Sequence, residues 1–307
     1  MYKDNIGLND RYNFGVEIEF AEANLAKLYL NLKEDNIPIK FRLNHKLYNI
    51  DFSKYWCLDI DNTVTKYDKN NDGMVYLGGE LSSKILQDNI SSWNEIKEIC
   101  YILRKNQASI NKNCSCHINI DASKFLSNNK FFKIFSQLIA LYENDFILYY
   151  MGDKYLDRVT RNEYAKSIRY RLLKKINNID FSAQNLFNEL LYHNSPTFMV
   201  QDGINMAFIE GTELIEIRYP NGTLDEKIIQ NNINFSLKLI DAIINDKFDS
   251  EKLTFLIDEE LKNKKYYQSY LNNNYSDFYK LVETISMTKE DTEDIMNQYE
   301  KVLKTRK

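Results

Sequence analysis

The stretch Gly15-Val16-Glu17-Ile18-Glu19-Phe20 alternates glutamates with apolar residues, and Glu213-Leu214-Ile215-Glu216-Ile217-Arg218-Tyr219 repeats the alternation much later in the chain. A period of two predicts half-buried β-strands. Glu17 and Glu19 would then share one face of a strand, as would Glu216 and Arg218. Acidic residues are depleted in strands, so these side chains need partners. Divalent cations, with a phosphate on the arginine, would supply them, and the two stretches therefore predict a metal–nucleotide site on a sheet.

The bulk composition is that of a soluble globular protein. The chain has 307 residues, of which 44% are hydrophobic and 27% charged, which suits one large domain or two smaller ones. A net charge of −4 favours neither nucleic acid nor an anionic membrane as a partner. We see no signal peptide and no apolar run of about 20 residues. Four cysteines in so long a chain are no disulfide framework, so we predict a reduced, cytoplasmic protein.

Strand and helix patterns mix along the chain without strict alternation, which predicts an α+β fold. The patterns indicate strands at 11–20, within 39–86, and at 116–120, 198–209 and 213–219, and helices at 21–35, 91–105, 128–150 and 224–245. We expect a catalytic domain over 1–248. Residues 249–307 are charged, rich in tyrosine and helical, and form a C-terminal extension packed on that domain. Thr288, followed by Glu290 and Asp291, resembles the start of its last helix.

The two alternating stretches each allow two interpretations. Two carboxylates spaced like Glu17 and Glu19 can ligate one hard cation or two neighbouring ones, as Mg²⁺ requires; the alternative is a solvated edge strand. Glu216 beside Arg218 fits a metal ligand next to a guanidinium that binds phosphate or carboxylate. The alternative there is a surface ion pair of small energetic value.

Cys114-Ser115-Cys116-His117-Ile118-Asn119 contains one of three histidines. Two thiols and an imidazole suggest zinc, but no second Cys or His cluster completes four ligands. A Cys–His nucleophile is a further alternative, although adjacent Cys116 and His117 would face opposite sides of a strand. On a strand, His117 and Asn119 would share one face, which suits a contact from His117 to magnesium or phosphate; a structural histidine with its hydrogen bonds satisfied is the alternative.

Other candidate residues lie outside these segments. Asp61 and Glu80 add carboxylates at strand-like positions, with a turn or surface role as the alternative. Arg161 and Arg169 belong to a basic segment, where we predict nucleotide contacts and where a solvated helix face is the alternative. The sequence has neither a P-loop nor a Gly-x-Gly-x-x-Gly motif, so metals and arginines on the sheet would have to hold any nucleotide.

In order along the chain, Gly15–Phe20, Trp56–Asp61, Gly79–Ser83, Cys114–Asn119 and Glu216–Arg218 with Gly222-Thr223 resemble the amidoligase family. This family belongs to the carboxylate–amine ligase superfamily typified by glutamine synthetase. The resemblance covers roughly residues 13–240. The usual family pattern is Cys-Gly-x-His-Val-His, so Ser115 replaces a glycine and Asn119 a histidine. Lys84 also stands where the family has proline.

The resemblance implies a curved antiparallel sheet flanked by helices that binds ATP and Mg²⁺ or Mn²⁺. By similarity, the metal ligands are Glu17, Glu19, Glu80 and Glu216. His117 matches a histidine near the metal-bound phosphate, and Arg218 matches an arginine on the transferred phosphoryl group or the acyl substrate. Asp61 is placed either behind the metal ligands or near the incoming amine.

The implied activity is ATP-dependent amide-bond formation through an acyl phosphate. The substrates would be a carboxylate-bearing peptide or amino acid and an amine or ammonia. Alternatives are a phosphotransferase of the same superfamily and a catalytically silent relative that binds nucleotide or peptide. The C-terminal helices could then dock a partner protein. A zinc-dependent hydrolase is a more distant alternative.

Overall fold

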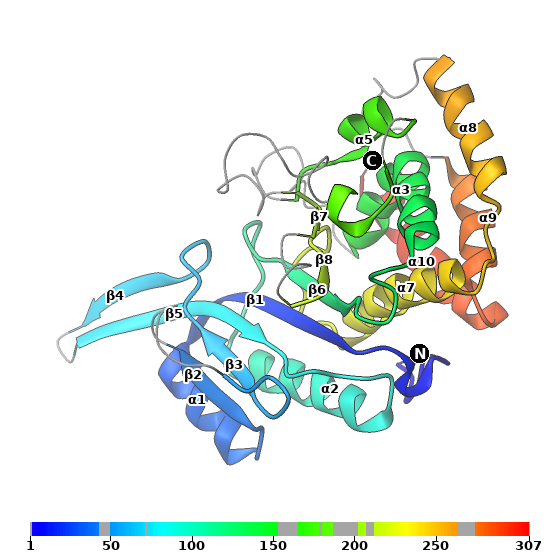
Figure 1. The fold of residues 1–307 in the computed structure, drawn as a ribbon. Coiled ribbons are helices and arrows are strands. Elements are labelled where there is room, and N and C mark those ends of the chain that lie inside the picture. Colours follow the sequence, from blue (N-terminus) through cyan, green and yellow to red (C-terminus); the bar gives the residue numbers. More distant parts are fainter. Residues whose placement is uncertain are drawn as a thin grey trace. The chain divides into compact units, whose positions relative to one another are not determined.

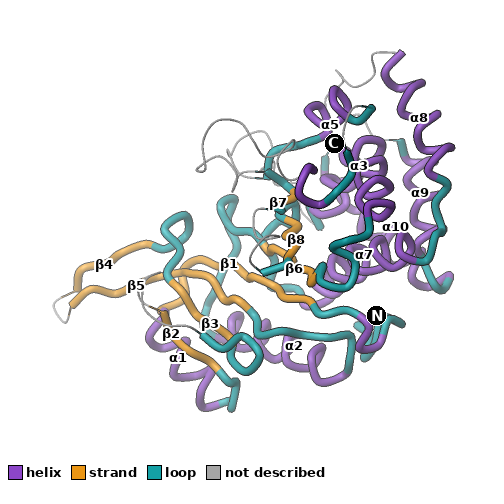
Figure 2. Tube along the Cα trace, viewed as in Figure 1, coloured by secondary structure: helices purple, strands orange, loops and turns teal. Residues whose placement is uncertain are grey.

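The chain divides into two compact units in a computed structural model (Figures 1 and 2). The first unit comprises Met1–Ile120 with Pro220–Asn231, and the second comprises Asp121–Tyr219 with Asn232–Lys307. The structure describes residues 2–42, 50–70, 73–152, 165–177, 180–186, 202–206, 212–262 and 274–306. Mixed strands and helices confirm the α+β class, and the split of the chain at 248 stays a prediction.

Strand β1 (Phe14–Asn24) lies inside the sheet of the first unit, as its alternating sequence predicts. The other strands of this unit are β2 (Ile39–Arg42), β3 (Trp56–Asp59), β4 (Lys66–Asn70), β5 (Gly73–Ser82) and β6 (Cys116–Asp121). They pair in the order β2-β3-β5-β1-β6, and β4 pairs with β5. These pairs are antiparallel except β2–β3, which is parallel. Residues 43–55 connect β2 to β3, about the dozen residues that a parallel connection needs.

The two faces of this sheet differ in polarity. Helices α1 (Leu25–Glu34) and α2 (Ile90–Lys105) lie on one face (Figure 1). There Phe14 stacks on Trp93 of α2, with ring centroids 5.4 Å apart. Val16, Ile18 and Phe20 point to the same face and are at most 1% exposed. Because side chains alternate along a strand, the glutamates of β1 lie on the face away from these helices.

Two element boundaries differ from the sequence prediction. β1 continues to Asn24, because its register with β5 shifts after Phe20 and Glu22 adopts a left-handed conformation with φ of 69°. Helix α1 therefore starts after Asn24, whose side chain accepts from Lys27 N. Helix α2 is capped by Asn89, whose side chain accepts from Ser92 N, and it starts at Ile90, one residue before the predicted start at 91. In both cases a local Asn–backbone bond sets the helix start.

Asp88 fixes the N-terminal segment to the first unit. This residue is 1% exposed. Its carboxylate accepts hydrogen bonds of 2.7–2.9 Å from four donors: Ile6 N, Leu8 N, Asn9 N and Trp93 Nε1. A carboxylate is the side chain that can accept so many bonds, so Asp88 has a structural role.

The second unit is mostly helical and centres on α3 (Asn129–Tyr150), which the apolar pattern predicted. Around it are α5 (Arg169–Lys175), α8 (Ser250–Lys262), α9 (Tyr275–Ile285) and α10 (Lys289–Thr305), all of which contact α3. Strands β7 (Ile204–Asn205) and β8 (Leu214–Ile217) form an antiparallel pair. Helix α7 (Glu226–Ile244) contains the residues where the two units meet in sequence. The rest of the strand predicted at 198–209 falls largely outside the described residues.

The C-terminal helices complete the core of the second unit. Tyr299 of α10 donates to the buried carboxylate of Asp145. The ammonium of Lys238, which is 0% exposed, pairs with Asp291. Thr288 and Asp291 form the capping box that the sequence indicated. Residues beyond 248 thus supply partners to buried polar groups. Over the described part of the chain, we find no helix with both the length and the apolar character of a membrane span.

Candidate functional site

A row of charged side chains crosses the sheet of the first unit on the face away from α1 and α2. The strand registers place Arg42 opposite Asp59, Asp59 opposite Glu80, and Glu80 opposite Glu19. Directly opposed residues have their side chains on the same face. Four strands therefore bring one guanidinium and three carboxylates into a line that sequence spacing does not reveal.

Glu19, Asp61 and Glu80 form a carboxylate cluster. Each offers one oxygen, and these three oxygens lie within 4.8 Å of one another. Asp61 joins from the turn after β3, where its backbone N–H donates to Thr65 Oγ1, 3.1 Å away. The resemblance implied a site role for all three residues, and the fold brings them together.

Neighbouring donors orient each carboxylate of the cluster. Glu19 Oε2 accepts from Ser115 N at 2.7 Å, and Glu80 Oε1 accepts from Ser82 Oγ at 2.7 Å. Asp61 Oδ1 accepts from the backbone N–H and the hydroxyl of Thr63, both at 2.6 Å. The second oxygen of each carboxylate accepts no hydrogen bond from another residue in the described part of the chain. These oxygens suit a hard divalent cation.

The cluster is electrostatically strained without a cation. Burial raises the pKa of Glu80 well above its ordinary value of 4.5, and the charges of Glu17, Glu19 and Asp61 raise it further, against a hydrogen bond from Ser82 that lowers it. Arg42 offsets part of this charge, but its guanidinium already donates to Asp59 Oδ2 at 2.6 Å. Mutual repulsion among oxygen ligands is the arrangement that a bound cation relieves. The residues therefore fit Mg²⁺ or Mn²⁺.

Glu17 lies beside the cluster with both of its oxygens engaged. Its Oε2 lies 3.0 Å from His117 Nδ1, and its Oε1 accepts from Asn119 Nδ2 at 2.8 Å. His117 and Asn119 thus share a face, as predicted, and Asn119 binds the glutamate directly. Among the described residues, the groups of clustered ligand atoms contain no cysteine. This geometry offers no support for zinc held by Cys114 and Cys116.

Glu216 and Arg218 share a face at the end of β8, as predicted, and they are buried rather than at the surface. The guanidinium donates to Glu216 Oε1, and Asn205 Nδ2 donates to Glu216 Oε2 at 2.7 Å. Arg218 is 8% exposed, and its Nε–H finds no acceptor among the residues that the structure describes. Both residues belong to the second unit, and their participation in one site with Glu17 and Glu19 stays a prediction.

Arg169 is buried within the second unit instead of lining a solvated helix face. Its Nε donates to Ala140 O at 2.8 Å, and its Nη2 pairs with Glu260 at 2.9 Å. Glu143 accepts from the backbone N–H of Arg169 and of Ile168 and so holds the start of α5. A nucleotide contact from Arg169 stays a prediction, and Arg161 lies outside the described residues.

The turn after Arg218 belongs to the first unit and pairs with residues 114–116, at the start of β6. Cys116 N donates to Pro220 O at 3.2 Å, and Gly222 N donates to Cys114 O at 3.0 Å. A Cβ on Gly222 would lie 2.6 Å from the Cβ of Cys114, so only glycine allows this approach. Gly222 was noted in the sequence as part of the family resemblance, and its pairing with Cys114 depends on the tertiary structure.

Sequence reasoning missed two interactions at the site, the Arg42–Asp59 pair and the Ser82–Glu80 hydrogen bond. The Arg42–Asp59 pair was not predicted, because Arg42 lies far from the acidic motifs in sequence and enters the row only through the parallel β2–β3 pairing. Ser82 was quoted as part of a motif, yet its role as the donor to Glu80 depends on the tertiary structure. A period-two reading of Ile39–Arg42 would have placed Arg42 on a strand, but not beside Asp59.

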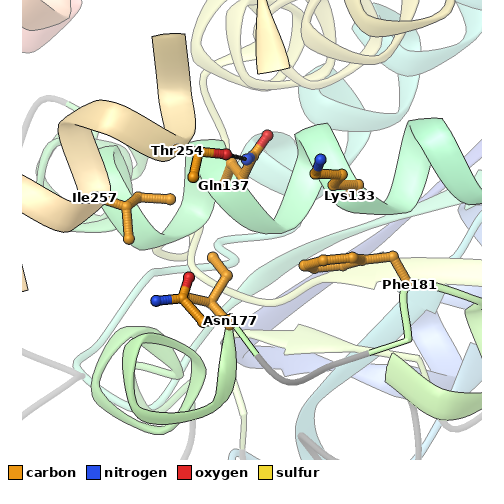
Figure 3. Close-up of a pocket in the computed structure, with 7 residues that line it drawn as sticks. Lys133, Gln137, Asn177, Phe181, Thr254 and Ile257 are labelled. Atoms are coloured by element: carbon orange, nitrogen blue, oxygen red, sulfur yellow. Dashed lines mark hydrogen bonds between the residues drawn. The ribbon is translucent and has the colours of Figure 1, made fainter. Parts of the chain in front are cut away.

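A cavity of about 220 Å³ in the second unit lies between α3, α8 and the residues that follow α5 (Figure 3). Gln137 of α3 donates across it to Thr254 of α8 at 2.8 Å. The described residues that line it include Lys133 as the charged group and no acid. This cavity therefore offers no carboxylate ligand to a divalent cation, unlike the carboxylate cluster.

Comparison with known proteins finds a protein family whose model covers the segments that carry the site. A family model described as "Putative amidoligase enzyme" matches residues 10–240. No curated protein matches the chain. The matched region contains Glu17, Glu19, Asp61, Glu80 and the other residues of the sheet described above, and it ends within α7. Because the match covers most of the sequence, the chain belongs to the amidoligase family.

Proposed function

We propose that this protein is an ATP-dependent ligase that joins a carboxylate to an amine or to ammonia. The observation that carries the proposal is the carboxylate cluster, in which oxygens of Glu19, Asp61 and Glu80 lie within 4.8 Å of one another. Family membership agrees with this chemistry. We propose that the substrate that supplies the carboxylate is a peptide or an amino acid.

The proposed reaction has two steps, formation of an acyl phosphate and its attack by an amine. An oxygen of the substrate carboxylate attacks the γ-phosphorus of ATP, which forms an acyl phosphate and releases ADP. The amine nitrogen then attacks the acyl carbon, loses a proton and expels inorganic phosphate. Bound Mg²⁺ or Mn²⁺ supplies charge neutralisation on the transferring phosphoryl group.

The chain's own residues take distinct roles in this proposal. Glu19 and Glu80, with Glu17 and Glu216, hold the cations. Asp61 joins the cluster, and its carboxylate also suits a proton acceptor for the incoming amine. We further propose that Arg218 contacts the phosphoryl group or the acyl substrate, since its Nε–H is a donor without an acceptor among described residues.

His117 is the proposed donor to a phosphate oxygen. Glu17 at 3.0 Å from Nδ1 orients its ring, in the way that a carboxylate fixes a histidine near a metal. Asn119 donates to the other oxygen of Glu17, so this departure from the family pattern has a structural use and is compatible with catalysis.

The test is ATP turnover by the purified full-length protein with Mg²⁺ and a panel of amino acids and short peptides. Hydroxylamine serves as the amine, because it converts an acyl phosphate into a hydroxamate that ferric chloride reveals. We expect ADP and hydroxamate to appear together and only with a suitable acid. Glu19→Gln should lower the rate by more than about 10-fold. Mutation of a residue that merely supports a metal ligand already costs that much, and Glu19 is itself a proposed ligand. Glu98→Gln, an exposed position on α2, is the matched control.

Three results would contradict the proposal. ATP binding without turnover in every mixture would indicate a silent relative. A phosphorylated product that is inert to hydroxylamine would indicate a phosphotransferase. Stoichiometric zinc in the purified protein, lost on Cys114→Ser, would indicate the cysteine site instead.

A further inference from the structure

Ser115 is a buried polar residue next to the carboxylate cluster. It is 0% exposed. Its backbone is fully used: its N–H donates to Glu19 Oε2 at 2.7 Å, and its carbonyl accepts from Glu19 N at 3.0 Å. Its hydroxyl oxygen, in contrast, has no hydrogen-bond partner among the residues that the structure describes. A buried hydroxyl without a partner is costly, so it calls for a ligand that the protein alone does not provide.

The strand register directs this hydroxyl to the face of the cluster. β1 pairs with β6 through Glu17 opposite His117 and Ile18 opposite Cys116. One further step along the same register places Glu19 opposite Ser115. Opposed residues share a face, so the Ser115 side chain lies on the side of Glu19, and Cys116 lies on the side of buried Ile18. On its other side Ser115 pairs with Asn221.

We propose that the Ser115 hydroxyl is a neutral oxygen ligand of the cation held by Glu19, Asp61 and Glu80. This inference rests on the proposed function and names one more ligand of its metal centre. Mg²⁺ and Mn²⁺ bind six oxygens, and carboxylates, hydroxyls and waters share that shell. The serine adds an oxygen without adding charge to a cluster that is already strongly acidic. The glycine of the family pattern cannot supply one.

The test is the affinity of the metal-free, full-length protein for Mn²⁺ and Cd²⁺ by calorimetry. The variants are Ser115→Ala and Ser115→Cys, and Ser136→Ala is the matched control because that buried hydroxyl already donates to Phe132 O at 2.7 Å. We expect Ser115→Ala to weaken Mn²⁺ binding about 10-fold and to melt no lower than the wild type without metal. Ser115→Cys should shift preference toward Cd²⁺, because thiolate is a soft ligand, with a cadmium–thiolate band in ultraviolet absorption.

The outcomes separate this inference from the proposed function. Mn²⁺ binding by the wild type that Ser115→Ala leaves unchanged would overturn the role of Ser115 alone. A change in affinity of equal size in Ser136→Ala would also overturn it. A folded wild type that binds no Mn²⁺ would overturn the metal centre itself, and the role of Ser115 with it.

Discussion

Glu80→Gln should make the metal-free protein more stable and its response to metal weaker. Glu80 lies directly opposite Glu19 and within 4.8 Å of an oxygen of Asp61. At that distance each pair of charges repels by about 3 kcal/mol for an effective dielectric constant near 20. Solvent screening reduces this, so we expect a net gain of about 1–2 kcal/mol in the free energy of unfolding without metal.

The same substitution should reduce the stabilisation by cation. A ligand at 100 times its Kd adds about 2.7 kcal/mol to the free energy of unfolding. Loss of one carboxylate should weaken binding at least 10-fold, which lowers that increment by about 1.4 kcal/mol. The assay is urea unfolding at pH 7, with EDTA and with Mn²⁺, for the wild type, Glu80→Gln and the exposed control Glu98→Gln.

The pH dependence of stability tests the sign of this effect, a metal-free Glu80→Gln that is more stable than the wild type, in a second way. The pKa of folded Glu80 is above its ordinary 4.5, so the stability it contributes is fully present below pH 4.5 and is lost as the pH rises through the folded value. The metal-free advantage of Glu80→Gln should therefore grow with pH above 4.5. If Glu80→Gln were less stable than the wild type in EDTA, the repulsion argument would be refuted. If Mn²⁺ stabilised the variant as much as the wild type, Glu80 would not be a ligand of the cation.

Three further predictions concern buried carboxylates outside the cluster. Burial, partly offset by hydrogen bonds from Tyr299 and the backbone, raises the pKa of Asp145 from 3.8 to about 6, so its contribution to stability is lost as the pH rises from 3.8 through 6. The stability of Asp145→Asn relative to the wild type should rise by roughly 2 kcal/mol between pH 4 and pH 7 in urea unfolding; an equal difference at both pH values would contradict this. Asp88→Ala should cost about 3–5 kcal/mol by the same assay, because the donors Ile6 N, Leu8 N and Trp93 Nε1 stay buried, whereas a loss below about 1 kcal/mol would show that water replaces the carboxylate. Asp291→Ala should also cost about 3–5 kcal/mol, since it takes a carboxylate from the buried ammonium of Lys238. Adding Lys238→Met should recover most of that loss, and no recovery would count against the ion pair.

The sequence identified most of the elements through local signals. The alternation at Gly15–Phe20 was enough to place two glutamates on one face of a strand, because the period of a strand is a property of the backbone. The apolar pattern likewise identified α3, and the cap at Thr288 identified the start of α10. Local signals were weaker at boundaries, where the conformation of Glu22 prolonged β1 beyond the predicted end.

Partnerships between strands required the tertiary structure. The sequence singled out Glu19, Asp61 and Glu80 separately, since carboxylates in strand-like segments are unusual. Their grouping depends on the β1–β5 and β3–β5 registers. A shift of one residue in either register would turn the side chains of the shifted strand to the other face of the sheet. The placement of the Ser115 hydroxyl beside Glu19, without a partner in the described part of the chain, depends on the same kind of information. The sequence by itself thus determined the chemistry available to this protein, and only the pairing of distant strands decided which of those groups meet.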